Sequence, residues 1–183
     1  MPQRTQHPTR LRPRPREGHS LRRAVGVYGA EPLTLTLTLV MIGAGAPSLT
    51  VLVELLGAPH EVAASAARAL KGMAVIEALC DELLSVGVVG ALVRACGVLS
   101  PAELREQAAR ALGNIASHPL DAAIEEAGGV SALVTMLDAN AGLPLSATAA
   151  ALGALSNQTD SPDVRRAFVE AEGVARLVPL LTG

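Results

Sequence analysis

The sequence repeats with a period of forty-odd residues, and this repetition constrains the fold more than any other feature. A glycine-containing segment that ends in an apolar run recurs as GVVGALVRAC, GGVSALVTML and EGVARLVPLL, at Gly87–Cys96, Gly128–Leu137 and Glu172–Leu181. An earlier segment, SLTVLVELL at Ser48–Leu56, has the same ending. The leucines of the shared Leu-Val pair lie 40, 41 and 44 residues apart, at Leu52, Leu92, Leu133 and Leu177. Intervals of this length are typical of stacked helical units.

Two further elements accompany this segment in a fixed order. An alanine-rich block follows it, and its copies ARALKGMA, ARALGNIA and AAALGALS align on Leu70, Leu112 and Leu152. A shorter element precedes it, at Leu83–Val89, Ile124–Val130 and Phe168–Val174. Because apolar residues recur in these elements at helical spacing, their order predicts three helices per unit.

Local signals predict where these helices end and begin. Gly87, Gly128 and Gly173 are expected to turn the chain sharply before the second helix, because glycine tolerates a left-handed backbone. Before the third helix of one unit, Ser100-Pro101-Ala102-Glu103 predicts a capping serine, a proline at the first helical position and a glutamate one turn later.

The composition favours packed helices. Half of the 183 residues are hydrophobic, yet Tyr28 and Phe168 are the only aromatic ones, so a core must consist of Leu, Val and Ala. Such a core suits stacked helices better than a β-sandwich or barrel. Cys80 and Cys96 fall in apolar stretches and are interpreted as buried, reduced thiols, although one disulfide is compatible with the sequence. No apolar run reaches the roughly 18 to 20 residues that a membrane-spanning helix needs.

The string AIEEAGGVSALVTMLDA followed by ATAAALGALSN resembles the armadillo repeat, in which a short helix ends in a glycine turn, a buried ALV helix follows, and a long alanine-rich helix completes the unit. HEAT repeats fit less well, because they have two helices per unit. The resemblance implies an all-α, right-handed superhelical solenoid of three-helix repeats over residues 48–183. It would contain two full units, Ala74–Ser117 and His118–Ser156, flanked by two partial ones.

The resemblance also implies a concave groove, lined by the third helices, that binds an extended segment of another protein. In importin-α-like members a tryptophan and an asparagine four residues apart hold a basic peptide. The matching pairs here are Arg68 and Gly72, Arg110 and Asn114, and Ala150 and Ala154. Only Asn114 is retained, and the candidate groove residues are Arg68, Glu106, Arg110, Asn114 and Asn157.

The two arginines of this set favour a groove that holds carboxylates or phosphates, because a guanidinium group pairs with them through two hydrogen bonds. Glu106 lies one turn before Arg110, so an internal ion pair is the competing interpretation. If Arg110 binds a partner, Arg110→Glu weakens capture of that partner much more than Arg94→Glu does.

Catalytic, cofactor-binding and metal-binding residues are not expected. No glycine-rich phosphate loop and no G-x-S-x-G motif occurs, and the histidines are scattered, at His7, His19, His60 and His118. The acidic pairs Asp81-Glu82 and Glu125-Glu126 are interpreted as solvated helix faces. Asn157-Gln158-Thr159 matches a glycosylation acceptor in three residues only. We therefore predict a protein that is not an enzyme.

The first 47 residues differ from the rest. Residues 1–32 are predicted to form a disordered basic tail, with seven arginines against one acidic residue in Met1–Arg23. This tail is interpreted as an arm for acidic partners or nucleic acid, as an organelle transit segment, or as an inaccurately assigned start. Residues 33–47 are predicted to be degenerate or poorly ordered, and their LTLTLTL run is either the remnant of a first helix or a signal-peptide core.

The predicted function is protein binding. The leading interpretation is an intracellular scaffold or adaptor, in the cytoplasm or nucleus, that binds an extended partner segment in its groove. The alternatives are a regulatory or substrate-binding module of a larger protein such as a ubiquitin ligase, and a nuclear-import-type or co-chaperone armadillo protein. The last unit has no third helix, so end-to-end self-association through uncapped repeats is a further expectation.

Overall fold

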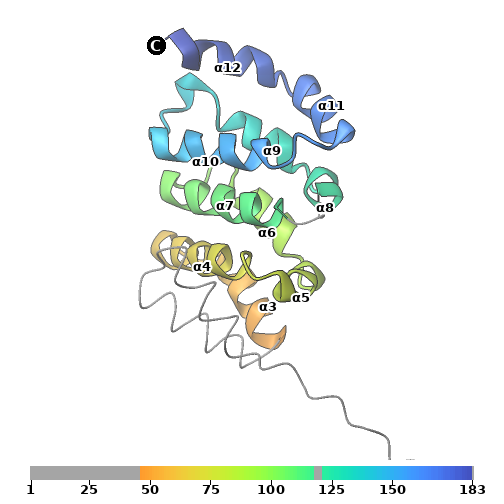
Figure 1. The fold of residues 1–183 in the computed structure, drawn as a ribbon. Helices are drawn as coiled ribbons and strands as arrows, with labels where there is room; N and C mark the ends of the chain where they lie inside the picture. The colour runs from red at the N-terminus through yellow and green to blue at the C-terminus, as the bar shows by residue number, and fades with distance from the viewer. Residues whose placement is uncertain (1–45, 118–120, 183) are drawn as a thin grey trace, which may run out of the picture.

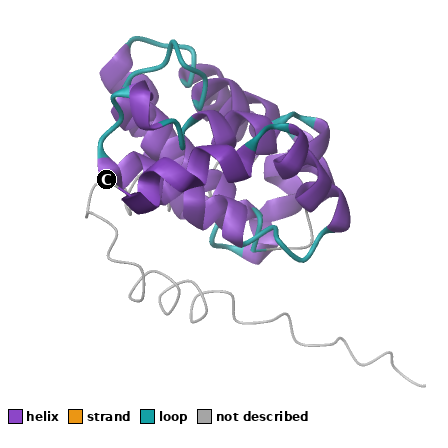
Figure 2. Cartoon of the chain, turned by 90° about the horizontal axis from the view of Figure 1, so that it is seen from above, coloured by secondary structure: helices purple, strands orange, loops and turns teal. Residues whose placement is uncertain are grey.

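The computed structural model describes residues 46–117 and 121–182, and the regular structure of these two ranges is entirely helical (Figure 1; Figure 2). In chain order the helices are α3 (Ala46–Leu55), α4 (His60–Met73), η1 (Glu77–Leu79), α5 (Cys80–Ser85), α6 (Val88–Ala95), α7 (Ala102–Ile115), α8 (Asp121–Glu126), α9 (Gly129–Thr135), η2 (Ala139–Ala141), α10 (Leu145–Ser156), α11 (Pro162–Glu170) and α12 (Gly173–Thr182). The predicted tail at residues 1–32 lies outside the described residues. So does the segment 33–47, except for its last two residues, which begin α3.

The helices stack in units of three. In α5–α7 and in α8–α10 a short first helix is followed by a second helix and a long third helix. The pair α3–α4 supplies the second and third helices of a further unit, and α11–α12 supplies the first and second helices of another. In Figure 1 the third helices α4, α7 and α10 lie one above another, with the first helices α5, α8 and α11 on the opposite side. The predicted all-α solenoid is confirmed.

Leucine and alanine build the core between these layers. Leu70, Leu92, Leu112 and Leu133 are each at most 1% exposed. The small residues of the third helices let their backbones approach closely, and α7 packs against both α4 and α10. At Gly113 of α7 a Cβ atom would lie 3.2 Å from the Cα atom of Ala154 in α10. A side chain at this position would therefore push the two helices apart.

A left-handed residue separates the first and second helices. Gly87 and Gly128 adopt φ angles of 73° and 74°, as predicted. The prediction for Gly173 is wrong, because the left-handed residue of that turn is Glu172, at φ 60°. Gly173 instead begins α12, where a Cβ atom would lie 2.4 Å from the ring of Phe168. Glycine is favoured at 173 because it leaves space for this ring, and not because of its backbone conformation.

A proline precedes each third helix. Pro59, Pro101 and Pro144 are the N-cap residues of α4, α7 and α10, and their φ angles are −53°, −59° and −61°. The predicted start of α7 is confirmed, but the predicted cap by Ser100 is wrong, because the helix has no side-chain cap. Pro101 occupies the N-cap position, so Ser100 lies one residue too far from the free N–H groups of the first turn.

These prolines lie 42 and 43 residues apart and define the structural register of the third helices. In this register Leu112 of α7 corresponds to Leu155 of α10, which is 6% exposed, and not to Leu152, which is 38% exposed. The alignment on Leu152 is therefore wrong by three residues, which is nearly one helical turn. The sequence misleads because Ala-Leu-Gly occurs in both helices, at 111–113 and at 151–153, on different faces.

Candidate functional site

The five candidate residues belong to the third helices and their ends. Glu106, Arg110 and Asn114 lie on successive turns of α7, because they are spaced four residues apart. Arg68 lies on α4, and Asn157 is the C-cap residue of α10. We call the surface that these side chains share with their neighbours on α4, α7 and α10 the third-helix face.

Both arginines of the third-helix face are already paired within the chain. Arg68 of α4 binds Glu103 of α7, with 2.6 Å between Nη2 and Oε1. Arg110 binds Glu106, with 3.0 Å between Nη2 and Oε1, so the internal pair that competes with partner binding is present. The Oε2 atom of Glu106 also accepts a hydrogen bond of 2.7 Å from Oγ of Ser146 in α10. These contacts link α4 to α7 and α7 to α10 at the surface.

Lys71 is a third cation on this face, and sequence reasoning did not identify it. Its Nζ atom donates to Oε1 of Gln107 at 3.2 Å, and it forms no ion pair among the described residues. Partial burial holds the pKa of Lys71 below its ordinary value of 10.5, and the charges of Arg110 and Arg68 lower it further. The negative charge of Glu106 raises the pKa of Lys71 and partly offsets this decrease. The available signal was its spacing of three residues from Arg68 on one helix.

Two asparagines bridge successive third helices in the same way. Asn114 donates through Nδ2 to the backbone oxygen of Lys71, at 2.9 Å. Asn157 donates through Nδ2 to the backbone oxygen of Gly113, also at 2.9 Å. Lys71 and Gly113 lie in the last turns of α4 and α7, where carbonyl groups lack a partner within the helix. The two amides therefore complete the hydrogen bonding of these helix ends and tie the three helices together.

The structural register corrects the predicted groove positions in α10. These positions are Gly153 and Asn157, and not Ala150 and Ala154, which are 8% and 1% exposed. Asn157, by contrast, is exposed. An asparagine therefore occupies the position of Asn114 in two of the three third helices that the structure describes.

Charge on the third-helix face is confined to α4 and α7. The helix α10, with the sequence LSATAAALGALS, contributes no charged side chain. On α4 and α7 the three cations Arg68, Lys71 and Arg110 accompany the two carboxylates of Glu103 and Glu106. The face thus has a weakly positive half at α4–α7 and an uncharged half at α10.

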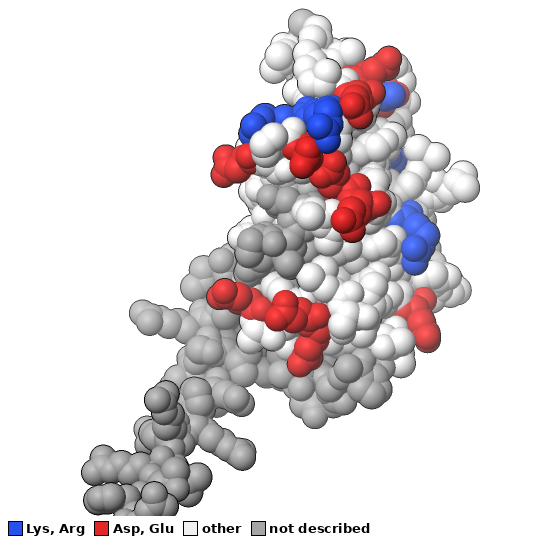
Figure 3. Space-filling view, turned by 90° about the vertical axis from the view of Figure 1, so that its right-hand side faces the viewer, with Lys and Arg blue, Asp and Glu red and all other residues white. Residues whose placement is uncertain are grey.

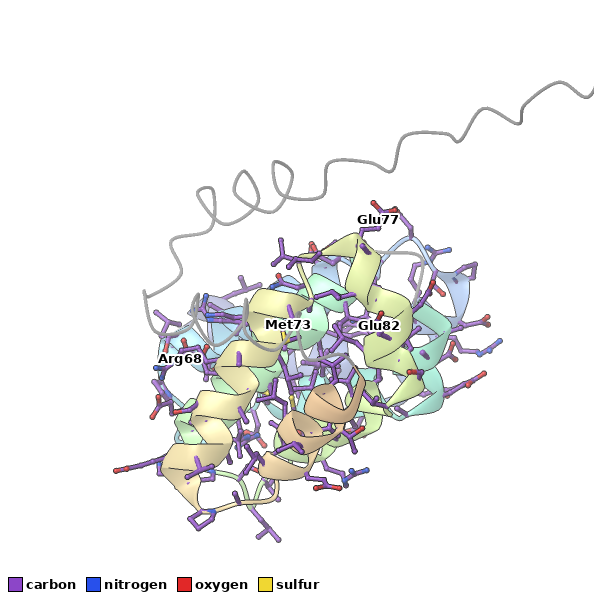
Figure 4. All side chains as sticks on the ribbon, turned by 90° about the horizontal axis from the view of Figure 1, so that it is seen from below. Arg68, Met73, Glu77 and Glu82 are labelled. Carbon is purple, nitrogen blue, oxygen red and sulfur yellow. The ribbon has the colours of Figure 1, made fainter. Side chains whose placement is uncertain are left out.

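Figure 3 shows more acidic than basic side chains on the side formed by the first helices. The helices α5 and α8 carry only acidic charges, whereas α11 also carries Arg165 and Arg166. Asp81, Glu82 and Glu126 are exposed, as predicted, whereas Glu125 is partly buried. Figure 4 places Glu77 and Glu82 on the side of the molecule away from Arg68. The acidic helices α5 and α8 and the third-helix face therefore present different electrostatic surfaces to a partner.

The described residues offer little for covalent or metal chemistry. Within residues 46–117 and 121–182 no group of three or more His, Cys, Asp or Glu residues is placed to hold a metal ion. Cys80 and Cys96 are buried and not joined to each other. Burial raises the pKa of Cys96 to about 12 and raises the pKa of Cys80 as well, so neither thiol ionises readily near neutral pH. None of the helices in these ranges is long and apolar enough to cross a membrane.

Comparison with solved structures finds engineered helical-repeat proteins. An engineered protein of the Northeast Structural Genomics Consortium superposes with a TM-score of 0.68 and 30% identity, over 90% of this chain and 72% of that chain. A designed armadillo repeat protein in complex with the peptide (KR)4 superposes with a TM-score of 0.68 and 27% identity, over 91% of this chain and 68% of that chain. A computationally designed armadillo repeat protein for modular peptide recognition superposes with a TM-score of 0.68 and 26% identity, over 91% of this chain and 68% of that chain. No protein-family model and no curated protein sequence matches the chain.

Proposed function

Because the chain is an armadillo-like repeat protein, we propose that it is a non-catalytic scaffold whose third-helix face holds an extended segment of a partner protein. One of the designed armadillo proteins that it resembles was solved with a bound peptide, which supports this proposal. A fold alone does not fix a function, so the kind of partner has to be inferred from the residues of the third-helix face.

The asparagines support an extended partner segment. The Nδ2 atoms of Asn114 and Asn157 are used within the chain, whereas their Oδ1 atoms make no hydrogen bond among the described residues. An amide oxygen accepts hydrogen bonds, so each asparagine can receive a main-chain N–H of a partner. The two residues occupy equivalent places in successive units, which suits a segment that runs along the stack.

Lys71 is the observation that favours an acidic segment. It is a partly buried cation whose side-chain partner among the described residues is a neutral amide. A carboxylate or phosphate beside its Nζ atom would be attracted by this lysine and by the neighbouring Arg68 and Arg110. The Arg68–Glu103 pair is exposed on both sides and is worth about 0–1 kcal/mol, so an incoming acid can compete with Glu103 for Arg68.

A basic segment is disfavoured at the same face. In the corrected register, the positions that hold tryptophan in importin-α-like proteins are occupied by Arg68, Arg110 and Gly153. A basic peptide would meet two cations and no aromatic ring there, which argues against the nuclear-import alternative. None of the described residues favours the ubiquitin-ligase or co-chaperone alternatives, and both stay predictions.

Fluorescence anisotropy with the labelled peptides (DE)4 and (KR)4 tests the proposal. We expect (DE)4 to bind more tightly, and Lys71→Glu or Arg110→Glu to weaken its binding by about tenfold. Arg94→Glu is the control, because it makes the same change of charge at an exposed position of the second helix α6. Tighter binding of (KR)4, or equal losses for Arg110→Glu and Arg94→Glu, would contradict the proposal.

A further inference from the structure

Gln107 of α7 differs in charge from the residues that pair with the neighbouring cations. Glu103 and Glu106 of the same helix each bind an arginine of the third-helix face through a carboxylate oxygen. Lys71 donates instead to the neutral amide of Gln107, with 3.2 Å between Nζ and Oε1. Among the described residues, the amide at position 107 therefore leaves the charge of Lys71 without a carboxylate partner.

The hydrogen bond from Lys71 determines which way the amide of Gln107 points. An ammonium group donates and cannot accept, so Oε1 rather than Nε2 of Gln107 faces Nζ of Lys71. The Nε2 atom makes no hydrogen bond among the described residues and is open to solvent. Gln107 thus offers two N–H donors next to an ammonium group that uses one of its three donors for this bond.

A carboxylate fits this pair of donors. Its two oxygens accept hydrogen bonds from two neighbouring groups at once, and a hydrogen bond between ions is stronger than one between neutral groups. Burial and the charges of Arg110 and Arg68 disfavour the ammonium form of Lys71 and lower its pKa, so a negative charge beside Nζ would stabilise that form. A basic side chain would be repelled by the same three cations.

We propose that Gln107 makes the third-helix face selective for acidic partners, because one carboxylate of the partner segment binds between Lys71 and Gln107 and accepts hydrogen bonds from Nζ and Nε2. This inference rests on the proposed function, since it names the point at which the acidic segment is held. The substitution Gln107→Glu would give the third cation an internal carboxylate partner as well, and the partner's carboxylate would lose its place.

Fluorescence anisotropy of the full chain with labelled (DE)4 tests this role of Gln107. Gln107→Glu keeps the shape of the side chain but supplies an internal carboxylate to Lys71, so the dissociation constant should rise about tenfold or more. Gln107→Met removes the amide without adding a charge and should raise the dissociation constant about threefold. Ser131→Glu is the control, because it adds the same charge at an exposed position of the second helix α9. Circular dichroism checks that each variant is folded.

Nuclear magnetic resonance of the isotope-labelled chain observes the side-chain amide of Gln107 directly, and a merely structural role of this residue would not change its signals on binding. The Nε2 protons should shift downfield with (DE)4 and also with acetate, but not with chloride at the same ionic strength. Signals that do not shift at saturating (DE)4, or equal effects of Gln107→Glu and Ser131→Glu, would overturn the inference and leave the proposed function standing. If acetate shifts the amide signals and (DE)4 does not bind, the proposed function fails and the carboxylate site stands. A chain that binds neither contradicts both.

Discussion

Two helix-interior glycines are expected to respond to alanine in opposite directions. In Gly113→Ala the new Cβ atom lies 3.2 Å from the Cα atom and 3.4 Å from the Cβ atom of Ala154. The Cα atom belongs to the backbone of α10 and cannot rotate away, so overpacking costs about 1–3 kcal/mol. Replacing a helical glycine gains about 1 kcal/mol, so the free energy of unfolding should fall by about 0–2 kcal/mol. In Gly153→Ala nothing lies within 4 Å of the new atom, so the free energy of unfolding should rise by up to about 1 kcal/mol.

Urea denaturation followed by far-ultraviolet circular dichroism measures both effects. The midpoint should fall for Gly113→Ala and rise for Gly153→Ala, with the same dependence on urea concentration in both. The alignment that equates Gly113 with Gly153 requires the same sign for both substitutions. Midpoints that shift in the same direction would refute the close α7–α10 contact and the register derived from it.

Three further predictions concern the turn before α12 and the third-helix face. Glu172→Gly should raise the free energy of unfolding by about 0.5–1 kcal/mol in urea denaturation, because it relieves a left-handed φ of 60°; a decrease would contradict the assigned turn. Asn114→Ala should lower the free energy of unfolding by up to about 1 kcal/mol through loss of the bond to the Lys71 carbonyl, whereas Ser65→Ala on the exposed side of α4 should leave it equal or raise it by up to about 0.5 kcal/mol through helix propensity. The unfolded chain binds more protons than the folded one between the lowered pKa of Lys71 and 10.5, so the free energy of unfolding should rise with pH across that interval. The pH dependence of acylation at Lys71, the only lysine of the sequence, reports its pKa, and Arg110→Gln should raise that pKa.

The solenoid could be predicted because its determinants are local and repeated. The spacing of the Leu-Val pairs, the glycines at 87 and 128 and the proline before α7 each act within one or two turns of chain. The predictions were wrong where the same short sequence is compatible with two structures. Ala-Leu-Gly fits α10 in two registers one turn apart, and only packing against α7 buries Leu155 and exposes Leu152. At the turn before α12, the ring of Phe168 occupies the space that a side chain at position 173 would need. The sequence of the turn does not reveal this contact.

The contacts of the third-helix face were likewise predictable only in part. The Glu106–Arg110 pair was predictable because both residues lie on one helix, four residues apart. The Arg68–Glu103 pair and the hydrogen bond from Asn157 to Gly113 join residues 35 and 44 positions apart. Such contacts depend on how neighbouring helices slide past each other, which the sequence of either helix leaves open. Lys71 owes its lowered pKa to burial and to Arg110 of the next unit, so its properties also depend on the assembled stack.

Nuclear magnetic resonance of the isotope-labelled chain, titrated with (DE)4, tests the central claim most directly. If the third-helix face binds an acidic extended segment, the largest amide shift changes occur on α4 and α7 around Lys71, Gln107 and Asn114. Changes concentrated on the first helices around Asp81 and Glu82, or spectra that do not change at saturating peptide, would contradict it.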